Sequence, residues 1–227
     1  MSTDGKTAIA IDGPAAAGKT VVGTLLAKKI GYRFLDTGMM YRAATVAALD
    51  AGADFEDLDE LARVAEEAEF EAIAGPDGET RIIVNGTDIT DGLRGHDVDS
   101  RVSVVSAIPR VREIMVSAQR KLASGGGIVM VGRDIGTVVL KDAEPKIYLT
   151  ASLETRAKRR YLEMKDNSNH QSLEQVLDTM RMRDEIDSSR DASPLKPAEE
   201  AVILETDDMT VDDVVHRLSE LTQSATH

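Results

Sequence analysis

The sequence predicts an α/β fold in which a five-stranded parallel sheet carries helices on both faces. Five short apolar runs alternate with segments whose apolar residues recur at helical spacing. One of these runs, residues 128–131, is apolar throughout, as central parallel strands are. A loop bounded by two glycines separates the first run from the first helical segment. The predicted strands are residues 7–11, 32–35, 128–131, 146–149 and 201–204.

The composition narrows the classes of function. The chain has 227 residues, 42% of them hydrophobic, so we expect a single domain over residues 1–227. Cysteine is absent, which excludes disulfides and thiol catalysis and fits a cytoplasmic location. A net charge of −13 makes nucleic acid and anionic membranes poor partners. No apolar stretch is long enough to span a membrane, and no long exposed apolar patch is evident, so a monomer is the default expectation.

The loop after the first strand matches a phosphate-binding pattern. Residues Gly13 to Thr20 read Gly-Pro-Ala-Ala-Ala-Gly-Lys-Thr, which fits G-x-x-x-x-G-K-[ST]. A strand precedes the motif and a helical segment over residues 22–30 follows it, which is the context that the motif needs. Backbone N–H groups of such a loop wrap a polyphosphate at the helix N-terminus. Lys19 would then reach the outer phosphates, and the Thr20 hydroxyl would bind Mg²⁺.

The second strand leads into the triplet Asp36-Thr37-Gly38 and a helix over residues 39–51. An Asp-Thr-Gly triplet also suggests an aspartic protease, but that chemistry needs two such carboxylates in a β-rich frame. The alternation of strand and helix therefore favours a helix start. The other helices are expected at residues 58–68, 97–107, 110–122, 153–164, 172–189 and 211–221.

Residues 63–95 interrupt the alternation. Residues 75–78 read Gly-Pro-Asp-Gly and predict a turn, and Asn85-Gly86 predicts a tight hairpin between two short strands. We expect a small antiparallel meander inserted into the α/β chain and lying over its sheet.

A second departure is the basic segment over residues 154–171. Arg156, Arg159 and Arg160 fall on one helical face at spacings of i, i+3 and i+4. A mobile basic segment that closes over a site of phosphoryl transfer would exclude water, which would otherwise accept the phosphoryl group. We therefore expect this segment to act as a lid.

Other arginines are expected at the ligand edge of the sheet. Arg133 directly follows the strand at residues 128–131, and Arg42 lies on the helix after the second strand. Ligands of open α/β sheets bind outside the carboxyl ends of the strands. Fixed cations there would stabilise phosphoryl transfer between two nucleotides, because charge spreads over the oxygens of the transferred group.

No general base is evident among the histidines, which lie in polar or terminal surroundings at His96, His170, His216 and His227. An alcohol acceptor gains from a base. A phosphate monoester does not, because its second pKa is about 6 and it is already an anionic nucleophile at pH 7. Many arginines without a base therefore favour a phosphate as the acceptor.

Several motifs together resemble those of bacterial-type cytidylate kinases, which are P-loop nucleoside monophosphate kinases. They are Gly13 to Val21, residues 35–38 with Tyr41 and Arg42, residues 108–112, Gly-Arg-Asp-Ile-Gly-Thr-Val-Val at 132–139, and Arg183-Asp184 with Asp187 and Arg190. They follow the family's order and spacing over nearly the whole chain. The resemblance implies transfer of the γ-phosphoryl group of ATP to CMP or dCMP with Mg²⁺, and it implies that the meander is the family's monophosphate-binding insertion.

The resemblance also implies a role for each matching residue. ATP would be held by Gly13, Pro14, Ala15, Ala16, Ala17, Gly18, Lys19, Thr20 and Val21. The phosphate of CMP would be held by Arg42, Arg133 and Arg190. The cytosine would be read by Ser103, Arg112 and Asp134, with Thr37 in the same pocket. The sugar would be held by Arg183 and Asp187. The transferred group would be stabilised by Lys19, Arg133, Arg156 and Arg160.

The chemistry of cytosine agrees with this assignment, because its amino group suits a carboxylate and its acceptors suit an arginine. Two positions depart from the family. Thr20 stands where many relatives carry a glycine before their threonine, so Thr20 or a neighbour would reach Mg²⁺. Residues 186–189, Ile-Asp-Ser-Ser, are less basic than in some members, so fewer phosphate contacts are expected there.

Two alternatives stay open. A P-loop kinase with another small acceptor would need a pocket for a hydroxyl group, usually with a carboxylate base. A GTP-binding switch would need an Asn-Lys-x-Asp motif, which the sequence lacks.

Overall fold

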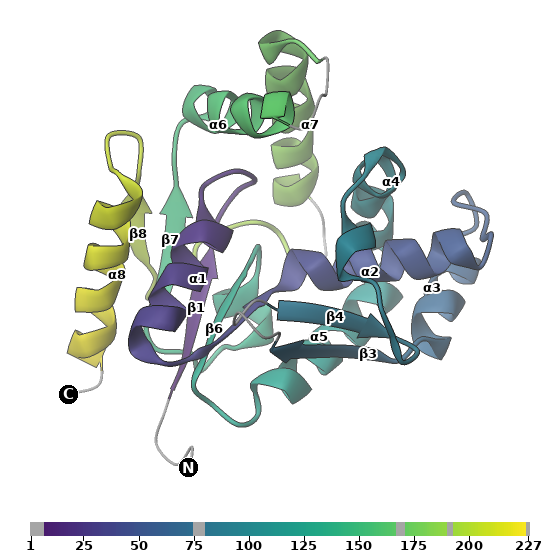
Figure 1. The fold of residues 1–227 in the computed structure, drawn as a ribbon, viewed down its shortest axis with the longest axis horizontal. Coiled ribbons are helices and arrows are strands. Elements are labelled where there is room, and N and C mark those ends of the chain that lie inside the picture. Colours follow the sequence, from purple (N-terminus) through teal and green to yellow (C-terminus); the bar gives the residue numbers. More distant parts are fainter. Residues whose placement is uncertain (1–6, 75–79, 167–170, 190–192, 226–227) are drawn as a thin grey trace.

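The computed structural model describes residues 7–74, 80–166, 171–189 and 193–225 (Figure 1). Its main sheet has five parallel strands in the order β2-β6-β1-β7-β8, and all five predicted strands are present. The strands are β1 Ala8–Asp12, β2 Arg33–Asp36, β6 Ile128–Gly132, β7 Lys146–Thr150 and β8 Val202–Glu205. Asp12, the last residue of the central strand, lies opposite Gly132 on one side and Tyr148 on the other.

Each helix predicted from the sequence is also present. The α-helices are α1 Lys19–Ile30, α2 Thr37–Asp50, α3 Leu58–Glu67, α4 His96–Ala107, α5 Pro109–Ala123, α6 Leu153–Asp166, α7 Leu173–Ser189 and α8 Val211–Ala225. Two short turns of helix are η1 Thr90–Leu93 and η2 Ile135–Val139.

Local capping explains several of the helix starts. The Asp36 carboxylate accepts a hydrogen bond from the Gly38 N–H at 2.9 Å and caps α2. Pro109 is the first residue of α5, where its missing N–H has no consequence. At the start of α7, Ser172 N–H donates to Gln175 Oε1 and Gln175 N–H donates to Ser172 Oγ, and the two bonds form a capping box.

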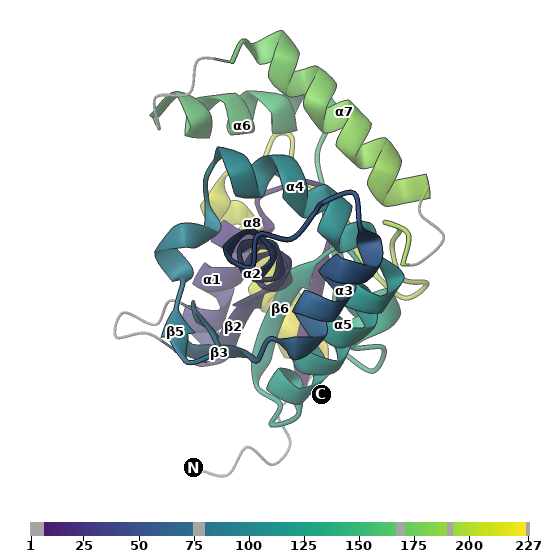
Figure 2. The ribbon, with the colours of Figure 1, turned by 90° about the vertical axis from the view of Figure 1, so that its right-hand side faces the viewer.

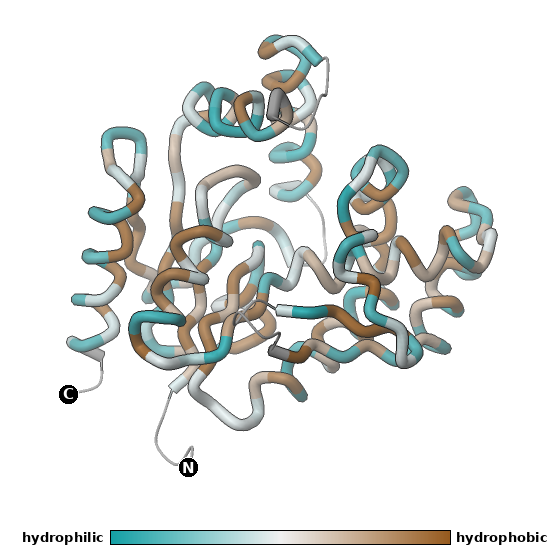
Figure 3. Tube along the Cα trace, in the orientation of Figure 1, coloured by the Kyte–Doolittle hydropathy of each residue, from teal (hydrophilic) through white to brown (hydrophobic). Residues whose placement is uncertain are grey.

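Two cores hold the helices against the two faces of the sheet. On one face, Ile9 packs in a cluster with Leu26 of α1 and Leu218 of α8. On the other face, Ala10 belongs to a cluster with Met115 of α5 and residues of α2 and α3. All five side chains are inaccessible to solvent. Apolar residues accordingly follow the strands and the inner sides of these helices, whereas hydrophilic residues prevail along α6 (Figure 3).

The predicted meander is a separate antiparallel sheet in the order β3-β4-β5. Its strands are β3 Phe70–Ala74, β4 Thr80–Val84 and β5 Thr87–Asp88, so the first part of the predicted range 63–95 still belongs to α3. Asn85 and Gly86 have φ values of 50° and 76°, as the predicted tight hairpin requires. The turn predicted at residues 75–78 lies outside the described residues. Thr80 Oγ1 donates to the Phe34 carbonyl at 2.7 Å and fastens β4 beside the edge strand β2.

Helices α6 and α7 lie above the carboxyl ends of the strands (Figures 1 and 2). Ala157 of α6 packs with Val176 and Met180 of α7, and this cluster rests on Ala15 and Ala16 of the glycine loop. The predicted lid, residues 154–171, therefore begins in α6 and includes residues 167–170, which lie outside the described part of the chain. No helix among the described residues combines the length and the apolar character needed to cross a membrane.

Candidate active site

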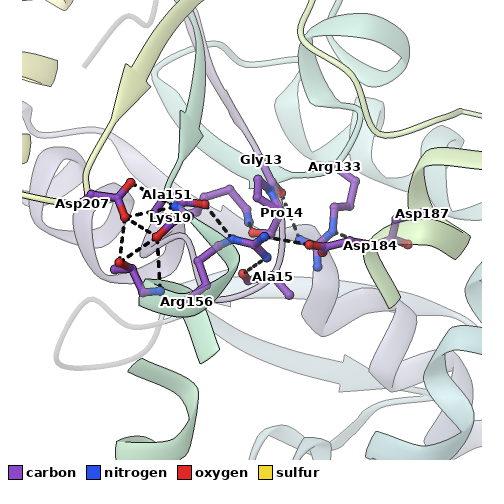
Figure 4. A network of polar contacts seen from close by, with 12 residues as sticks. Gly13, Pro14, Ala15, Lys19, Arg133, Ala151, Arg156, Asp184, Asp187 and Asp207 are labelled. Atoms are coloured by element: carbon purple, nitrogen blue, oxygen red, sulfur yellow. Dashed lines mark hydrogen bonds and ion pairs between the residues drawn. The ribbon is translucent and has the colours of Figure 1, made fainter. Parts of the chain in front are cut away.

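The glycine loop between β1 and α1 leaves no room for side chains at its start. Gly13 has a φ of +148°, and a Cβ there would lie 2.0 Å from the Leu149 carbonyl oxygen of β7. Gly18 has a φ of +93° and is the N-cap of α1. The Lys19 ammonium donates to the Pro14 carbonyl at 2.6 Å, so the lysine spans its own loop (Figure 4).

Several cations converge on this loop. Burial lowers the pKa of Lys19 well below its ordinary value, and the charges of Arg133 and Arg183 lower it further. Burial lowers the pKa of Arg183 to about 10, and the charges of Arg133, Arg42 and Arg160 act in the same direction. A cation whose pKa is lowered both by burial and by other cations lies close to them in a poorly solvated place. A polyanion bound among them would relieve this repulsion.

Arg133 connects three parts of the site. It follows β6, and its Nε donates to Asp187 Oδ2 of α7 at 2.9 Å. Its Nη1 also donates to the Gly13 carbonyl at 3.3 Å. Sequence analysis assigned Arg133 to the phosphate and Asp187 to the sugar; the structure pairs the two side chains, and Arg133 also reaches the glycine loop (Figure 4).

The residues expected to read the base are brought together in a buried pair. Arg112 Nη2 of α5 and Asp134 Oδ2 lie 2.5 Å apart, and each side chain is only 5% exposed. Arg112 also donates to the Ser106 carbonyl at 3.1 Å, and its guanidinium lies 5.3 Å from the centre of the Tyr41 ring. Ser103 lies one turn before Ser106 on α4, and its carbonyl accepts the Ser106 hydroxyl.

Thr37 and Arg42 are fixed on α2. The buried Thr37 hydroxyl donates to the Val131 carbonyl of β6 at 3.0 Å. Arg42 Nη2 pairs with Asp99 Oδ1 at 2.6 Å, and its Nη1 donates to the Leu93 carbonyl at 3.0 Å. The guanidinium is thus held at the end of the inserted segment before any phosphate is present. Arg190, the third residue assigned to this phosphate, lies outside the described residues.

The three arginines predicted to share a face of α6 engage different partners. Arg156 is 5% exposed, pairs with Asp184 at 2.7 Å and donates to the Ala15 carbonyl at 3.3 Å. Arg159 donates to the Thr206 carbonyl after β8 at 2.7 Å, and Arg160 pairs with Glu163 on its own helix at 3.3 Å. Arg156 therefore ties α6 and α7 to the glycine loop (Figure 4).

Thr20 offers oxygen ligands suited to Mg²⁺ together with Asp36. The Thr20 hydroxyl donates to Asp36 Oδ2 at 2.6 Å, while Asp36 Oδ1 caps α2. Mg²⁺ in such sites binds one or two protein oxygens and completes its shell with water and phosphate oxygens. The described residues contain no group of three or more His, Cys, Asp or Glu side chains placed to hold a metal. The Thr20 hydroxyl and the Asp36 carboxylate are oxygen donors of the kind that Mg²⁺ prefers, so these two residues fit a magnesium ion.

Sequence analysis assigned no role in the site to four carboxylates that the structure places there: Asp12, Asp36, Asp99 and Asp184. Asp12 is 3% exposed and accepts the N–H groups of Ile135 and Gly136 at 2.6 and 2.7 Å. Burial raises its pKa to about 6, and the nearby charge of Asp134 adds to this effect. One signal was available, because Asp12 is a carboxylate that ends a buried apolar strand directly before the glycine loop.

The histidines described by the structure are exposed, as expected. The side chains of His96 and His216 are 95% and 74% exposed. His170 and His227 lie outside the described residues.

Comparison with known sequences places this chain in a protein family. The sequence profile of the cytidylate kinases matches residues 9–224. A cytidylate kinase from Caldanaerobacter subterraneus subsp. tengcongensis is 47% identical over 212 residues, which cover 93% of this chain and 92% of the relative. A cytidylate kinase from Bacillus licheniformis is 42% identical over 216 residues, covering 95% of this chain and 96% of the relative.

Comparison with solved structures supports the fold. A shikimate kinase from Bacteroides thetaiotaomicron matches 96% of this chain and 98% of its own, with a TM-score of 0.50 and 13% identity. An uncharacterized protein from Eubacterium ventriosum matches 96% of this chain and 99% of its own, with a TM-score of 0.52 and 15% identity. At these identities the similarity concerns the P-loop kinase fold alone.

Proposed function

The chain belongs to the cytidylate kinase family, and on that premise we propose that it transfers the γ-phosphoryl group of ATP to CMP or dCMP. The products are ADP and CDP or dCDP. The observation that carries this proposal is the group of cations around the glycine loop of a chain whose net charge is −13: the charges of Arg133 and Arg183 lower the pKa of Lys19, and the charge of Arg133 also lowers the pKa of Arg183. Such a local excess of positive charge suits two nucleotide phosphates brought together.

ATP would lie on the glycine loop, with its phosphates against the N–H groups that precede α1. Lys19 would leave the Pro14 carbonyl and contact the β- and γ-phosphates. Thr20 and Asp36 would hold Mg²⁺, which when bound neutralises charge on the phosphates. Their 2.6 Å hydrogen bond supports this pairing, because it already brings a hydroxyl and a carboxylate oxygen together.

The phosphate of CMP would lie among Arg42, Arg133 and Arg190. One of its oxygens forms a bond to the γ-phosphorus as the bond from that phosphorus to the β,γ-bridging oxygen breaks, and ADP leaves. No proton has to be removed, since the acceptor is already ionised at pH 7. Lys19, Arg133, Arg156 and Arg160 would stabilise the charge on the transferred group.

Arg112 and Asp134 would read the base. Cytosine offers an amino donor to the Asp134 carboxylate and acceptors to the Arg112 guanidinium. Uracil offers a carbonyl where cytosine has the amino group, so it would leave the buried carboxylate without a donor. Ser103 and Thr37 would complete the pocket, and Arg183 and Asp187 would hold the sugar. We further propose that the enzyme works as a monomer in the cytoplasm.

An assay of ADP release tests the proposal. Purified protein with ATP and Mg²⁺ is offered CMP, dCMP, UMP, AMP, GMP and shikimate in turn. We expect the highest kcat/KM for CMP or dCMP. Equal rates with all nucleotides, or a preference for shikimate, would contradict the proposal.

A further inference from the structure

The helical turn η2, which follows β6, is capped by Asp12 of another strand and not by Asp134, the residue at its own N-cap position. Asp134 stands at the N-cap position of η2, with φ −146° and ψ 29°, yet its side chain makes no capping hydrogen bond. Aspartate is among the best N-cap residues, because its carboxylate accepts N–H groups that have no partner within the helix. Here that carboxylate is turned toward Arg112 instead.

The capping bonds come from another strand. Asp12, at the end of β1, accepts the Ile135 N–H at 2.6 Å through Oδ1 and the Gly136 N–H at 2.7 Å through Oδ2. The turn η2 packs tightly against this carboxylate. A Cβ at Gly136 would lie 3.3 Å from Asp12 Oδ2 and 3.3 Å from the Lys146 side chain. The Lys146 ammonium itself pairs with Glu200 at 3.0 Å.

The same segment is tied to the glycine loop a second time through Arg133, which donates to the Gly13 carbonyl. Asp12 and Gly13 are consecutive, so the donor loop and the segment that carries Arg133 and Asp134 share one attachment point at the end of β1. The spacing between the two proposed nucleotide sites is therefore set by bonds within the protein.

We propose that Asp12 is a positioning residue for the acceptor nucleotide: it caps η2 in place of Asp134 and thereby leaves the Asp134 carboxylate free to pair with Arg112 and read the base. This inference rests on the proposed function. Without the Asp12 carboxylate, the N–H groups of Ile135 and Gly136 would be buried without acceptors, and Asp134 is the nearest group in sequence able to satisfy them. Asp134 would then turn away from Arg112.

Replacement by asparagine isolates this role, because Asp12→Asn keeps the size of the side chain. An asparagine offers one acceptor oxygen and one NH₂ donor, and the latter would face an N–H group. Steady-state kinetics should show a KM for CMP raised about tenfold and a CMP-to-UMP ratio of kcat/KM lowered by a similar factor. The KM for ATP should change by less than about threefold, since the backbone of the glycine loop is unaltered.

Asp213→Asn is a matched control. Asp213 also accepts a backbone N–H, that of Thr210, at 3.0 Å, and Thr210 Oγ1 accepts the Asp213 N–H at 3.2 Å in a capping box at the start of α8. We expect this control to leave both KM values and the base preference unchanged. The inference is overturned if Asp12→Asn raises the KM for ATP and for CMP equally, or leaves the preference for CMP over UMP intact.

A second measurement does not depend on activity or on the variant folding. In the wild-type protein, the amide proton resonances of Ile135 and Gly136 should move together as Asp12 titrates, and the side-chain signals of Arg112 should follow. The charges of Asp134 and Lys19 act on the pKa of Asp12. The titration is therefore followed in the wild-type protein, with both of these residues intact. Amide resonances that do not move overturn the capping role. If they move but no nucleotide is phosphorylated, the proposed function fails and the capping role stands.

Discussion

Arg112 and Asp134 form an ion pair of 2.5 Å, with side chains only 5% exposed, although 22 residues separate them in the chain. One comes from α5 and the other from the segment after β6. A buried pair of this kind contributes little net stability, because removing both charges from water opposes their attraction. We therefore propose that the pair serves recognition of the base rather than stability.

Breaking this pair should alter both stability and base preference. Asp134→Asn leaves the Arg112 charge buried without its partner, which should lower the free energy of unfolding by about 3 kcal/mol. The preference for CMP over UMP should fall by about 100-fold, since the donor and acceptor pattern no longer excludes uracil. Urea denaturation and competition kinetics measure the two effects. Arg110→Ala, which breaks the exposed pair with Glu66, is the control and should change stability by less than about 1 kcal/mol. An unaltered base preference in Asp134→Asn would refute the assigned role.

Lys19→Met should abolish turnover without unfolding the protein. The methionine keeps the length of the side chain but removes the charge that contacts the transferred phosphate, so kcat should fall by about 1,000-fold. Because burial lowers the pKa of Lys19, its charge disfavours folding, and the variant should be at least as stable as the wild type. Lys28→Met, at an exposed position of the same helix, should retain wild-type kcat. Near-normal turnover in Lys19→Met would exclude the proposed role.

Arg133→Ala should impair the acceptor side more than the donor side. Its guanidinium is proposed to hold the CMP phosphate and contacts Asp187, which is proposed to hold the sugar of CMP. We expect a higher KM for CMP, a lower kcat and an almost unchanged affinity for ATP, measured by calorimetry with a non-hydrolysable analogue. A defect confined to ATP binding would count against the assignment.

Stability should depend on pH through Asp12. The pKa of this group rises from 3.8 to about 6 on folding, chiefly through burial, so between these values the folded state binds more protons than the unfolded state. The contribution of Asp12 to stability therefore falls as pH rises from about 4 to about 6, by up to about 3 kcal/mol. The difference in unfolding free energy between wild type and Asp12→Asn should decrease over this range. A difference that stays constant with pH would show that Asp12 is not buried as described.

Asp207→Asn provides a contrast of opposite sign. Hydrogen bonds from Ser152 and Thr155 lower the pKa of Asp207, so its contribution is lost as pH falls rather than as it rises.

The strands, the helices and the glycine loop could be predicted because their signals are local. The continuous apolar run before Gly132 predicts a buried strand, Asp36 and Ser172 predict helix starts, and Asn85-Gly86 predicts a hairpin. Each depends on residues within one turn of the chain or on a single period of apolar residues.

The ion pairs of the site could not be predicted in this way. The partners of Arg42 and Arg156 are Asp99 and Asp184, and nothing in their spacing marks them. The place of Asp12 at the end of a buried strand was a signal, but its donors could not be predicted, because they lie more than 100 residues further on and reach it only through the pairing of β1 with β6. Helical spacing also grouped Arg156 with Arg160, whereas their contacts depend on which elements surround α6.

The contact between Gly13 and the Leu149 carbonyl decides which glycine can be used to study nucleotide affinity. A methyl group at position 13 would push β1 and β7 apart, so an alanine there would be measured as a loss of folding. At Gly18 a methyl group meets no atom within 4 Å, and the penalty is confined to the backbone angle. A substitution at Gly18 therefore tests nucleotide binding, whereas a substitution at Gly13 tests the packing of the sheet.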